Sequence, residues 1–303
     1  MAEQARTYVN TTQAAKALGL SVSTVKRWVD DGVLPALKTA GGHRKLLLAD
    51  VIELARRGAL PHADLSFLAE ADAAAIDSRS LEKVGERLYR ALGGGDAVQT
   101  RTLIFGAFRS GVAIEDLADQ VIRPAMERIG QDWERGGIDV MEEHRASQLC
   151  AATLYELKAV LERRASKNRP RAVGGAPEKD YSVLPTLLAQ LVLLDAGWDA
   201  VNLGPNTPFR SLEKAIIDLR PRLLWLSVCH LEAEADFIAG YRSLYQKAEN
   251  AGVAVAVGGR ALTDSLRSRI PYTTHGDGLS HLAAFARTLH PRPRLPQRGR
   301  PRQ

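Results

Sequence analysis

The sequence is poor in cysteine and has no long apolar run. Its 303 residues include only two cysteines, Cys150 and Cys229. Two are too few for a disulfide framework, which predicts a protein kept in a reducing compartment. No apolar stretch approaches the roughly 20 residues that a membrane-spanning helix needs, and the N-terminus lacks the apolar core of a secretory signal. We therefore expect a cytoplasmic protein that contacts no membrane.

Acidic residues are missing from one end of the chain. The formal net charge is +6, and residues 290–303 contain five arginines and no aspartate or glutamate. The remainder is almost neutral, so a nucleic-acid surface must be a local patch that a motif identifies. We expect this basic tail to be disordered. It either adds sequence-independent DNA affinity or is a solvated terminus.

Length and composition predict a multidomain globular protein. Apolar residues make up 45% and charged residues 25% of the chain, and 303 residues suffice for two or three separate cores. Changes of hydrophobic period divide the chain into five segments. These are a winged helix-turn-helix head, a linker, a four-helix bundle, a doubly wound α/β domain and the basic tail, over residues 1–58, 59–80, 81–168, 169–289 and 290–303.

The head has the pattern of a helix-turn-helix followed by a basic hairpin. A helix over residues 12–18 ends at a glycine, and a second helix over residues 22–31 begins after the capping residue Ser21. Two short helices joined by a tight turn form a helix-turn-helix. The segment 34–45 predicts a hairpin with basic residues at its tip, and a third helix follows over residues 50–57.

Side chains on the second helix and the hairpin are the candidate DNA contacts. A recognition helix presents its outward residues to base edges in the major groove, whereas basic residues on the hairpin bind phosphates. A helical protein-interaction module with incidental lysine and arginine is the alternative. The candidate contacts are Ser23, Thr24, Lys26 and Arg27 on the helix, and Lys38, His43, Arg44 and Lys45 on the hairpin.

Four helical patterns follow the linker. They cover residues 81–92, 96–110, 114–135 and 139–167, and their short connections predict antiparallel neighbours in a four-helix bundle. Pro124 should kink or split the third helix, because proline cannot continue the hydrogen-bonding pattern.

A large aromatic residue and a carboxylate–imidazole pair flank the last of these turns. Trp133 closes the third helix, and Glu143 and His144 lie about one turn into the fourth. An apolar surface with a few polar groups is typical of a small-molecule site. The alternative is a capped helical hairpin in which the tryptophan belongs to the core and the pair is solvated.

From residue 171 onward, strands alternate with helices. This pattern predicts a parallel, doubly wound sheet that binds ligands at the carboxyl ends of its strands. Small residues at that edge allow a broad ligand to approach the backbone, although tight turns without a ligand would also explain them. Those residues are Gly204, Ser227, Gly258 and Gly259.

Two family resemblances rest on these motifs. The sequences Val22-Ser23-Thr24-Val25-Lys26-Arg27-Trp28 and Gly41-Gly42-His43-Arg44 resemble the winged-helix head of MerR and excisionase-like proteins. With the bundle and the α/β domain added, nearly the whole chain resembles the light-responsive, cobalamin-binding CarH family of repressors. The resemblance implies that Trp133, Glu143 and His144 pack over the adenosyl group of adenosylcobalamin. It also places Ser227 and the pair Gly258–Gly259 beside the nucleotide tail.

The chain departs from that family at two positions. The segment Asp180–Pro185 matches the family motif whose histidine binds cobalt from below, but Ser182 replaces the histidine and Pro185 a glycine. A hydroxyl is a poor cobalt ligand compared with imidazole. The second departure is Glu134, which stands where light-sensing members have a cobalt-binding histidine. Both cobalt-binding imidazoles of the family are therefore missing.

Three interpretations of the ligand remain open. The chain binds a cobalamin without a lower histidine, or binds haem or another tetrapyrrole such as a bilin, or has no ligand and uses the module for assembly. For a haem, His144, Cys229 and His230 are candidate axial ligands, but we favour for Cys229–His230 a buried thiol and a hydrogen-bonded imidazole at a strand end. We expect a transcriptional repressor rather than an enzyme, since no substrate barrel is present. Its homo-oligomer, a dimer or tetramer, would bind a double-stranded DNA operator. A cobalamin-dependent methyltransferase subunit is the enzymatic alternative.

Overall fold

The computed structural model describes residues 8–38, 44–47, 50, 51, 54, 78–163 and 169–290. Its chain divides into two compact units, considered separately below: residues 1–81 with 101–112, and residues 82–100 with 113–303. Within the described residues, no helix is both long and apolar enough to cross a membrane.

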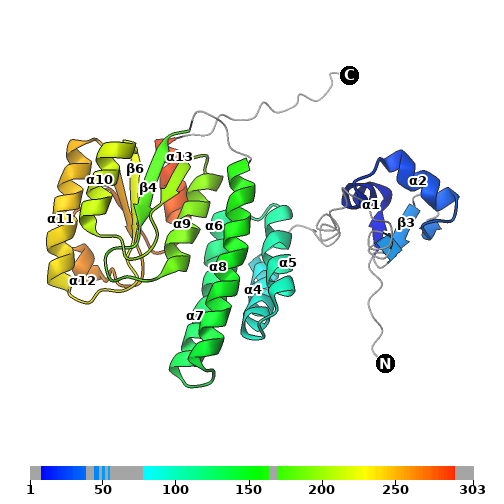
Figure 1. Ribbon diagram of the computed structural model, residues 1–303, viewed down its shortest axis with the longest axis horizontal. Coiled ribbons are helices and arrows are strands. Elements are labelled where there is room, and N and C mark those ends of the chain that lie inside the picture. The colour runs from blue at the N-terminus through cyan, green and yellow to red at the C-terminus, as the bar shows by residue number, and fades with distance from the viewer. Residues whose placement is uncertain are drawn as a thin grey trace. The chain divides into compact units, whose positions relative to one another are not determined.

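The N-terminal head contains the predicted helix-turn-helix and a small antiparallel sheet (Figure 1). Asn10 caps the first helix and makes a reciprocal pair with Gln13: its side chain accepts from the Gln13 amide at 2.9 Å and its amide donates to the Gln13 side chain at 2.8 Å. Ser21 caps the second helix. The strand order is β1-β3-β2. The elements are β1 (Tyr8–Asn10), α1 (Thr11–Leu18), α2 (Val22–Asp30), β2 (Ala36–Lys38) and β3 (Arg44–Leu47).

A compact apolar core holds the head together. Val25 of α2, Leu34 and Leu46 of β3 are at most 1% exposed, and Trp28 packs against this cluster. The hairpin tip at residues 39–43 and most of the predicted third helix lie outside the described residues. The two helices and the paired strands confirm the helix-turn-helix and both sides of the hairpin.

The helical segment that follows has the four predicted parts, two of which differ from the prediction. Helix α4 (Ser78–Gly93) begins inside the segment expected to be linker. The helix expected over residues 114–135 contains a π-helical segment. The elements are α5 (Ala97–Arg109), α6 (Ile114–Asp116), η2 (Leu117–Ile122), α7 (Arg123–Glu134) and α8 (Val140–Arg163).

Pro124 explains why the long helix changes its geometry. It stands at the second position of α7, where its nitrogen has no hydrogen to donate and its ring would crowd the carbonyl of Gln120. The chain accommodates this with wider π turns immediately before α7. The helical run continues through this segment, so Pro124 changes its geometry without splitting it, and the π geometry was not predicted.

Polar contacts join α4 to α7 and α8. The Tyr89 hydroxyl donates to Asp132 at 2.6 Å, and Arg128 pairs with Glu86 at 2.5 Å. Arg145 of α8 donates to the carbonyl of Gly93 at 2.7 Å, at the C-terminal end of α4. These contacts fix the helices that lead into and out of the α7–α8 turn.

The C-terminal part is a five-stranded parallel sheet in the order β5-β4-β6-β7-β8, which confirms the doubly wound fold. Helices α9 and α13 pack together on one face and α10 and α11 on the other (Figure 1). The strands are β4 (Arg171–Gly175), β5 (Asp199–Asn202), β6 (Leu223–Ser227), β7 (Ala254–Gly258) and β8 (Thr274–Gly276). The helices are α9 (Val183–Asp195), α10 (Phe209–Leu219), α11 (Glu234–Asn250), α12 (Asp264–Arg267) and α13 (Leu279–Leu289).

Some details of this sheet lie beyond what the alternating pattern predicts. Gly174 and Gly175 belong to β4. A side chain at Gly174 would lie 2.2 Å from Trp225, so close packing between neighbouring strands requires glycine there. The last strand begins at Thr274, and the short helix α12 was not predicted.

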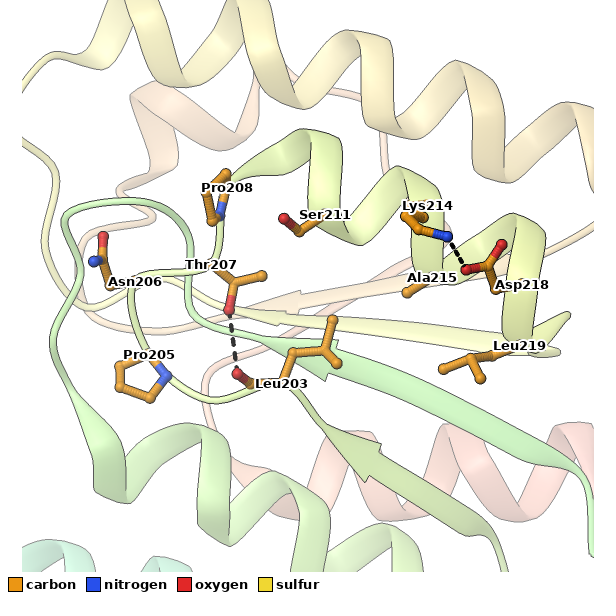
Figure 2. A pocket seen from close by; sticks show the side chains of 10 residues that line it. All are labelled: Leu203, Pro205, Asn206, Thr207, Pro208, Ser211, Lys214, Ala215, Asp218 and Leu219. Atoms are coloured by element: carbon orange, nitrogen blue, oxygen red, sulfur yellow. Dashed lines mark hydrogen bonds and ion pairs between the residues drawn. The ribbon is translucent and has the colours of Figure 1, made fainter.

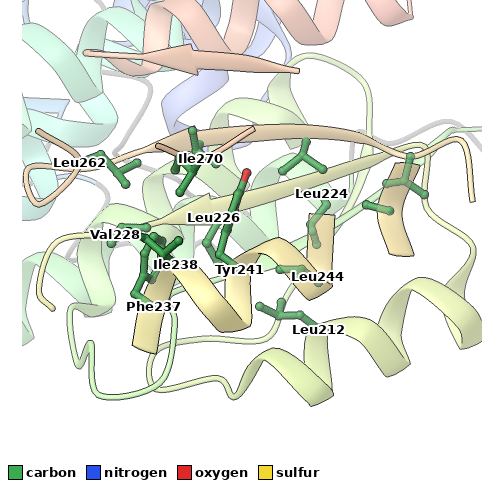
Figure 3. Close-up of a cluster of buried hydrophobic side chains, with 14 of the residues drawn as sticks. Leu212, Leu224, Leu226, Val228, Phe237, Ile238, Tyr241, Leu244, Leu262 and Ile270 are labelled. Carbon is green, nitrogen blue, oxygen red and sulfur yellow. The ribbon is translucent and has the colours of Figure 1, made fainter. Parts of the chain in front are cut away.

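The core on the α10–α11 side is continuous and apolar (Figure 3). Leu224 and Leu226 of β6 project onto Phe237, Ile238 and Tyr241 of α11. The buried Tyr241 hydroxyl donates to the carbonyl of Pro271 at 2.7 Å, so its one polar group is satisfied. This core holds rigidly the strands whose carboxyl ends carry the predicted site.

Candidate functional site

The predicted small residues gather at the carboxyl edge of the parallel sheet. Gly204 follows β5, Ser227 ends β6 and pairs in register with Gly258 of β7, and Gly259 comes next. Gly204 has φ +86°, and a side chain there would meet no atom within 4 Å, so the surface beside it is open. At Gly259, with φ +117°, a side chain would lie 2.2 Å from the Val228 carbonyl oxygen. Backbone packing therefore suffices to require Gly259, whereas Gly204 leaves room on the surface.

The loop after β4 is held by one buried carboxylate. Asp180 is 0% exposed, and its oxygens accept from three backbone N–H groups. Those of Ser182, Cys229 and His230 lie at 3.0, 2.6 and 3.1 Å. The loop after β4 is thereby joined to the loop after β6.

Ser182 is the N-cap residue of α9, but its side chain makes no capping hydrogen bond. A capping oxygen normally accepts from the second or third helical N–H, and the third helical residue here is Pro185, which has none. The proline fits because the first turn of a helix tolerates it. The hydroxyl of Ser182 is thus not used to cap its own helix.

The two loops next to Asp180 are also connected. The Lys179 amide donates to the Asn206 side chain at 2.8 Å, and the Asn206 amide donates to the Asp180 carbonyl at 2.7 Å. The Lys179 ammonium pairs with Glu232 at 2.5 Å. Lys179 and Asn206 both have positive φ, +68° and +51°. Residues with a side chain rarely adopt this conformation, and the hydrogen bonds and the ion pair just described hold it in place. The loops after β4, β5 and β6 therefore form one hydrogen-bonded edge, here called the rim.

The chemistry of Cys229 and His230 bears on the haem interpretation. Burial, together with the nearby Asp180 carboxylate, raises the pKa of the Cys229 thiol above its ordinary value. A protonated thiol is a poor metal ligand, and its sulfur lies 3.8 Å from the Ser227 hydroxyl. Cys229 is only partly buried and the His230 side chain is exposed, so the pair is not the buried thiol and hydrogen-bonded imidazole of the structural interpretation.

A hollow of about 450 Å³ lies beside the rim, between the chain that follows β5 and helix α10 (Figure 2). Within its lining, the Thr207 hydroxyl donates to the Leu203 carbonyl at 3.4 Å. Lys214 and Asp218 of α10 form an ion pair on the other side of the hollow. Its lining includes Leu203 and Asn206 of the rim segment but none of the four predicted small residues. The hollow is thus adjacent to the predicted ligand edge and distinct from it.

The α7–α8 turn presents the predicted tryptophan to solvent. Trp133 is 47% exposed, so the alternative in which it belongs to the core is wrong. Glu143 is half-buried and accepts from the Ser147 hydroxyl at 2.8 Å, while the mostly exposed His144 imidazole lies 3.7 Å from Glu143. In Figure 1 this turn lies at the same end of its unit as α12, which follows β7. The pair is partly solvated, and the aromatic ring is available for contact.

Four exposed apolar residues near these surfaces were not predicted. They are Val140 and Met141 in the first turn of α8, and Tyr181 and Leu203 at the rim. The sequence could have indicated them, because each is an apolar residue next to a turn and lies outside the apolar face that the repeat of its helix or strand predicts. An apolar contact surface therefore extends beyond Trp133.

In the head, the candidate DNA contacts of α2 are mostly accessible. Ser23, Lys26 and Arg27 are exposed, whereas the Thr24 hydroxyl is 2.8 Å from that of Ser21. One guanidinium nitrogen of Arg44, Nη2, donates to both carboxylate oxygens of Asp30 of α2, at 2.7 and 3.0 Å. Lys45 is exposed. His43 and the side chain of Lys38 lie outside the described residues.

The donor set does not fit a metal ion ligated by the protein below the rim. Within the described residues, no group of three His, Cys, Asp or Glu side chains could hold a metal. Ser182 presents a hydroxyl where the family resemblance places an imidazole, and all Asp180 contacts are to backbone N–H groups. The glycine-lined rim and the exposed tryptophan do fit a broad, largely apolar ligand without such a bond.

Comparisons with known proteins identify two domains. A helix-turn-helix domain model matches residues 8–63, and a B12 binding domain model matches residues 84–158, which include the α7–α8 turn. The chain therefore joins a helix-turn-helix domain to a B12 binding domain, as the sequence predicted.

Two repressors of Myxococcus xanthus are similar in sequence. CarH is 30% identical over 47% of this chain and 46% of its own length, so this alignment spans about half of it. CarA is 24% identical over 84% of this chain and 87% of its own length. Among solved structures, the monomethylamine corrinoid protein of Methanosarcina barkeri has the same fold. Its TM-score is 0.58 at 17% identity, over 68% of this chain and 98% of that one.

Proposed function

We propose that this chain, a CarH-like relative of the repressors CarH and CarA, is a DNA-binding transcriptional regulator whose assembly and DNA affinity depend on a bound corrinoid. The observation that carries the proposal is the joining of a helix-turn-helix domain and a B12 binding domain in one chain. In such a chain, ligand binding to the B12 binding domain can change DNA binding by the helix-turn-helix domain.

The head supplies the DNA contacts. Arg27, exposed on α2, is the candidate base contact, since arginine bidentate to guanine is worth about 1–3 kcal/mol of discrimination. Lys45 and the hairpin arginine Arg44 bind phosphates, which sets register without reading sequence. Arg27→Ala is therefore expected to relax sequence preference, whereas Arg44→Ala weakens binding to every sequence.

The apolar α7–α8 surface and the glycine-lined rim would hold the ligand. Trp133, Val140 and Met141 would contact it from the helices, and Gly204 and Ser227 from the rim. Ser182 would supply no nitrogen to the metal of a corrinoid held there. Ser182→Ala should leave the visible spectrum of the bound corrinoid unchanged, whereas Ser182→His should shift it if the introduced imidazole reaches the metal.

Control of DNA binding follows from assembly. A ligand shifts an equilibrium between oligomers only if it binds one of them better than the other. Two heads in one oligomer can occupy half-sites about 34–36 Å apart, one turn of the double helix. Light is a variable of the experiment because the resemblance is to light-responsive repressors.

The test is selection from a random duplex pool by the full chain. It is performed with adenosylcobalamin, with hydroxocobalamin and without corrinoid, in the dark and in light. Enrichment of a two-fold symmetric site under one of these conditions and its loss under another is the expected result. Failure to enrich any sequence under all conditions would overturn the DNA-binding proposal.

The second candidate is a corrinoid-carrying subunit of a methyltransferase. It is favoured by the shared fold with the monomethylamine corrinoid protein. A methyl transfer catalysed by the chain together with a methyltransferase, but no selected DNA site, would support it over the regulator.

A further inference from the structure

A second hollow, of about 700 Å³, lies at the edge of the sheet opposite to the rim. It is bordered by the C-terminal ends of α10 and α11, which pack side by side (Figure 1), and by the residues that lead into β6 and β7. Ser227 of the rim ends β6, whereas Arg222 of this hollow directly precedes it. The volume is that of a small-molecule site, and no lining residue is shared with the first hollow.

The lining of this second hollow combines apolar side chains with positive charge. Among the described residues that line it none is acidic, and Lys247 is paired with Glu213 at 2.5 Å. Arg220 and Arg222 are exposed, and within the described part of the chain their side chains have neither an ion pair nor a hydrogen bond. Ile217 is 66% exposed. The apolar side chains of the lining are Ile216, Ile217, Pro221 and Val253.

The two helix ends do not cancel this positive charge. The C-terminal end of a helix carries about half a negative charge, so the ends of α10 and α11 together offset roughly one of the two unpaired arginines. About one positive charge therefore remains beside the apolar lining, which favours an anion over a neutral ligand.

Arg220 stands where a glycine is easier to accommodate. It ends α10 with φ +46° and ψ +56°, the left-handed conformation that glycine adopts without strain. Pro221 follows it, and a proline favours extended backbone at the residue before it. Strained residues of this kind gather at functional sites. The backbone gives no reason for an arginine at this position, so the reason lies in its side chain.

We propose that this hollow is a second binding site, which takes a small amphiphile with an apolar chain and a terminal carboxylate. The carboxylate binds at Arg220 and Arg222, since a guanidinium pairs with a carboxylate through two parallel hydrogen bonds. The chain lies against Ile217 and Pro221 and removes their apolar surface from water.

This site goes beyond the proposed function and does not depend on it. The hollow and the rim lie at opposite edges of one sheet, so a carboxylate bound at Arg220 and Arg222 leaves the rim open to its own ligand. The following experiment therefore needs neither corrinoid nor DNA.

The probes are octanoate and octanamide, which share one apolar chain and differ in charge. The full chain is titrated with each, and the backbone amide signals of Ala251 and Gly252 in the lining are followed by NMR. We expect saturable shifts with octanoate and about tenfold weaker binding of octanamide, the factor that one charge-assisted hydrogen bond contributes. Equal binding of the two probes would overturn the proposal, as would octanoate that causes no saturable shift.

Arg220→Gly separates the role of the side chain from that of the backbone. It removes the guanidinium and relieves the left-handed strain, so we expect octanoate to bind about tenfold more weakly and the protein to be at least as stable to urea as the wild type. Arg210→Ala removes an exposed charge near the start of the same helix and should bind octanoate as the wild type does.

Unchanged octanoate binding by Arg220→Gly would contradict the proposal. Lower stability of Arg220→Gly would contradict it as well, because the arginine would then serve the fold. If this variant does not fold, Arg222→Gln replaces it in the titration. Weaker octanoate binding by Arg222→Gln supports the site, and wild-type binding would refute it.

Discussion

At the scale of single residues, the pair between Asp30 and Arg44 bears most on DNA binding. Arg44 was expected to contact phosphate, yet its guanidinium binds the Asp30 carboxylate within the head. The pair competes with DNA for the arginine. It could not be read from the sequence, because hairpin and helix meet only in the folded head.

Releasing Arg44 should strengthen DNA binding. Arg44 in the wild type is shared between Asp30 and a phosphate, so Asp30→Asn is expected to raise affinity for all duplexes and to steepen the slope of log K against log salt by up to about 0.9, the value of one phosphate contact. Fluorescence anisotropy at several salt concentrations measures both. Asp31→Asn removes the neighbouring charge without touching Arg44, so an equal change in slope for both variants would contradict the competition.

Cys150 illustrates how burial controls reactivity. Burial raises the pKa of its thiol to about 12, so almost no thiolate is present near neutral pH. In a Cys229→Ser background we expect Cys150 to resist alkylation in the native protein and to react on unfolding. Rapid labelling at pH 8, with circular dichroism showing an intact fold, would refute this expectation.

At the scale of elements, the π-helical segment η2 caps a helix of the α/β domain. The Asp119 carboxylate accepts from the Leu279 and Ser280 amides, both at 2.9 Å, at the start of α13. A side chain at Gly278 would lie 2.7 Å from Asp119. The glycine therefore permits the approach, and this cap comes from about 160 residues away in the chain.

Asp119→Ala should remove this cap and lower the free energy of unfolding by about 1 kcal/mol. Glu127→Ala on α7, whose pair with Arg123 is exposed and 4.0 Å long, is the control and should change it little. Urea denaturation of the two variants provides the comparison. Equal stability of Asp119→Ala and the wild type would show that the cap contributes nothing.

An ion pair between Glu213 of α10 and Lys247 of α11 joins these two helices, and its strength depends on pH. Burial acts to raise the pKa of the Glu213 carboxyl, but hydrogen bonds from Lys247 and Ser243 outweigh it, and the net pKa lies below its ordinary value of 4.5. A depressed pKa stabilises the fold above the ordinary value, and this contribution is lost as the pH falls through the folded-state value. Glu213→Gln should therefore destabilise at pH 7 and lose its effect in acid, unlike the exposed Glu249→Gln. A constant difference between Glu213→Gln and wild type from pH 7 to pH 3 would contradict the linkage.

Local signals made most elements predictable, and tertiary contacts account for the remainder. The cap at Ser21 and the proline Pro124 are visible in the sequence. The cap acts as expected, whereas the proline changes the geometry of its helix without splitting it. The position of β8 and the short helix α12 depend on pairing and packing with distant segments. In the site, Ser182 was recognisable, but the partners of Asp180 come from a loop 49 residues further on.

At the scale of the molecule, the B12 binding helices and the α/β domain are held together by polar contacts that need no ligand. Besides the Asp119 cap, Arg287 pairs with the buried Glu115, and Arg123 donates to the Asp277 carbonyl at 2.8 Å. A ligand is therefore expected to act on assembly through the exposed surface around Trp133 and Met141, without separating these two parts.

Gel filtration of the full chain with its visible spectrum recorded across the peak tests the central claim most directly. After incubation with adenosylcobalamin in the dark, we predict that corrinoid absorption elutes with the protein, at an oligomer size that differs from the corrinoid-free chain. A protein peak without visible absorption, at the same size with and without the corrinoid, would contradict the account.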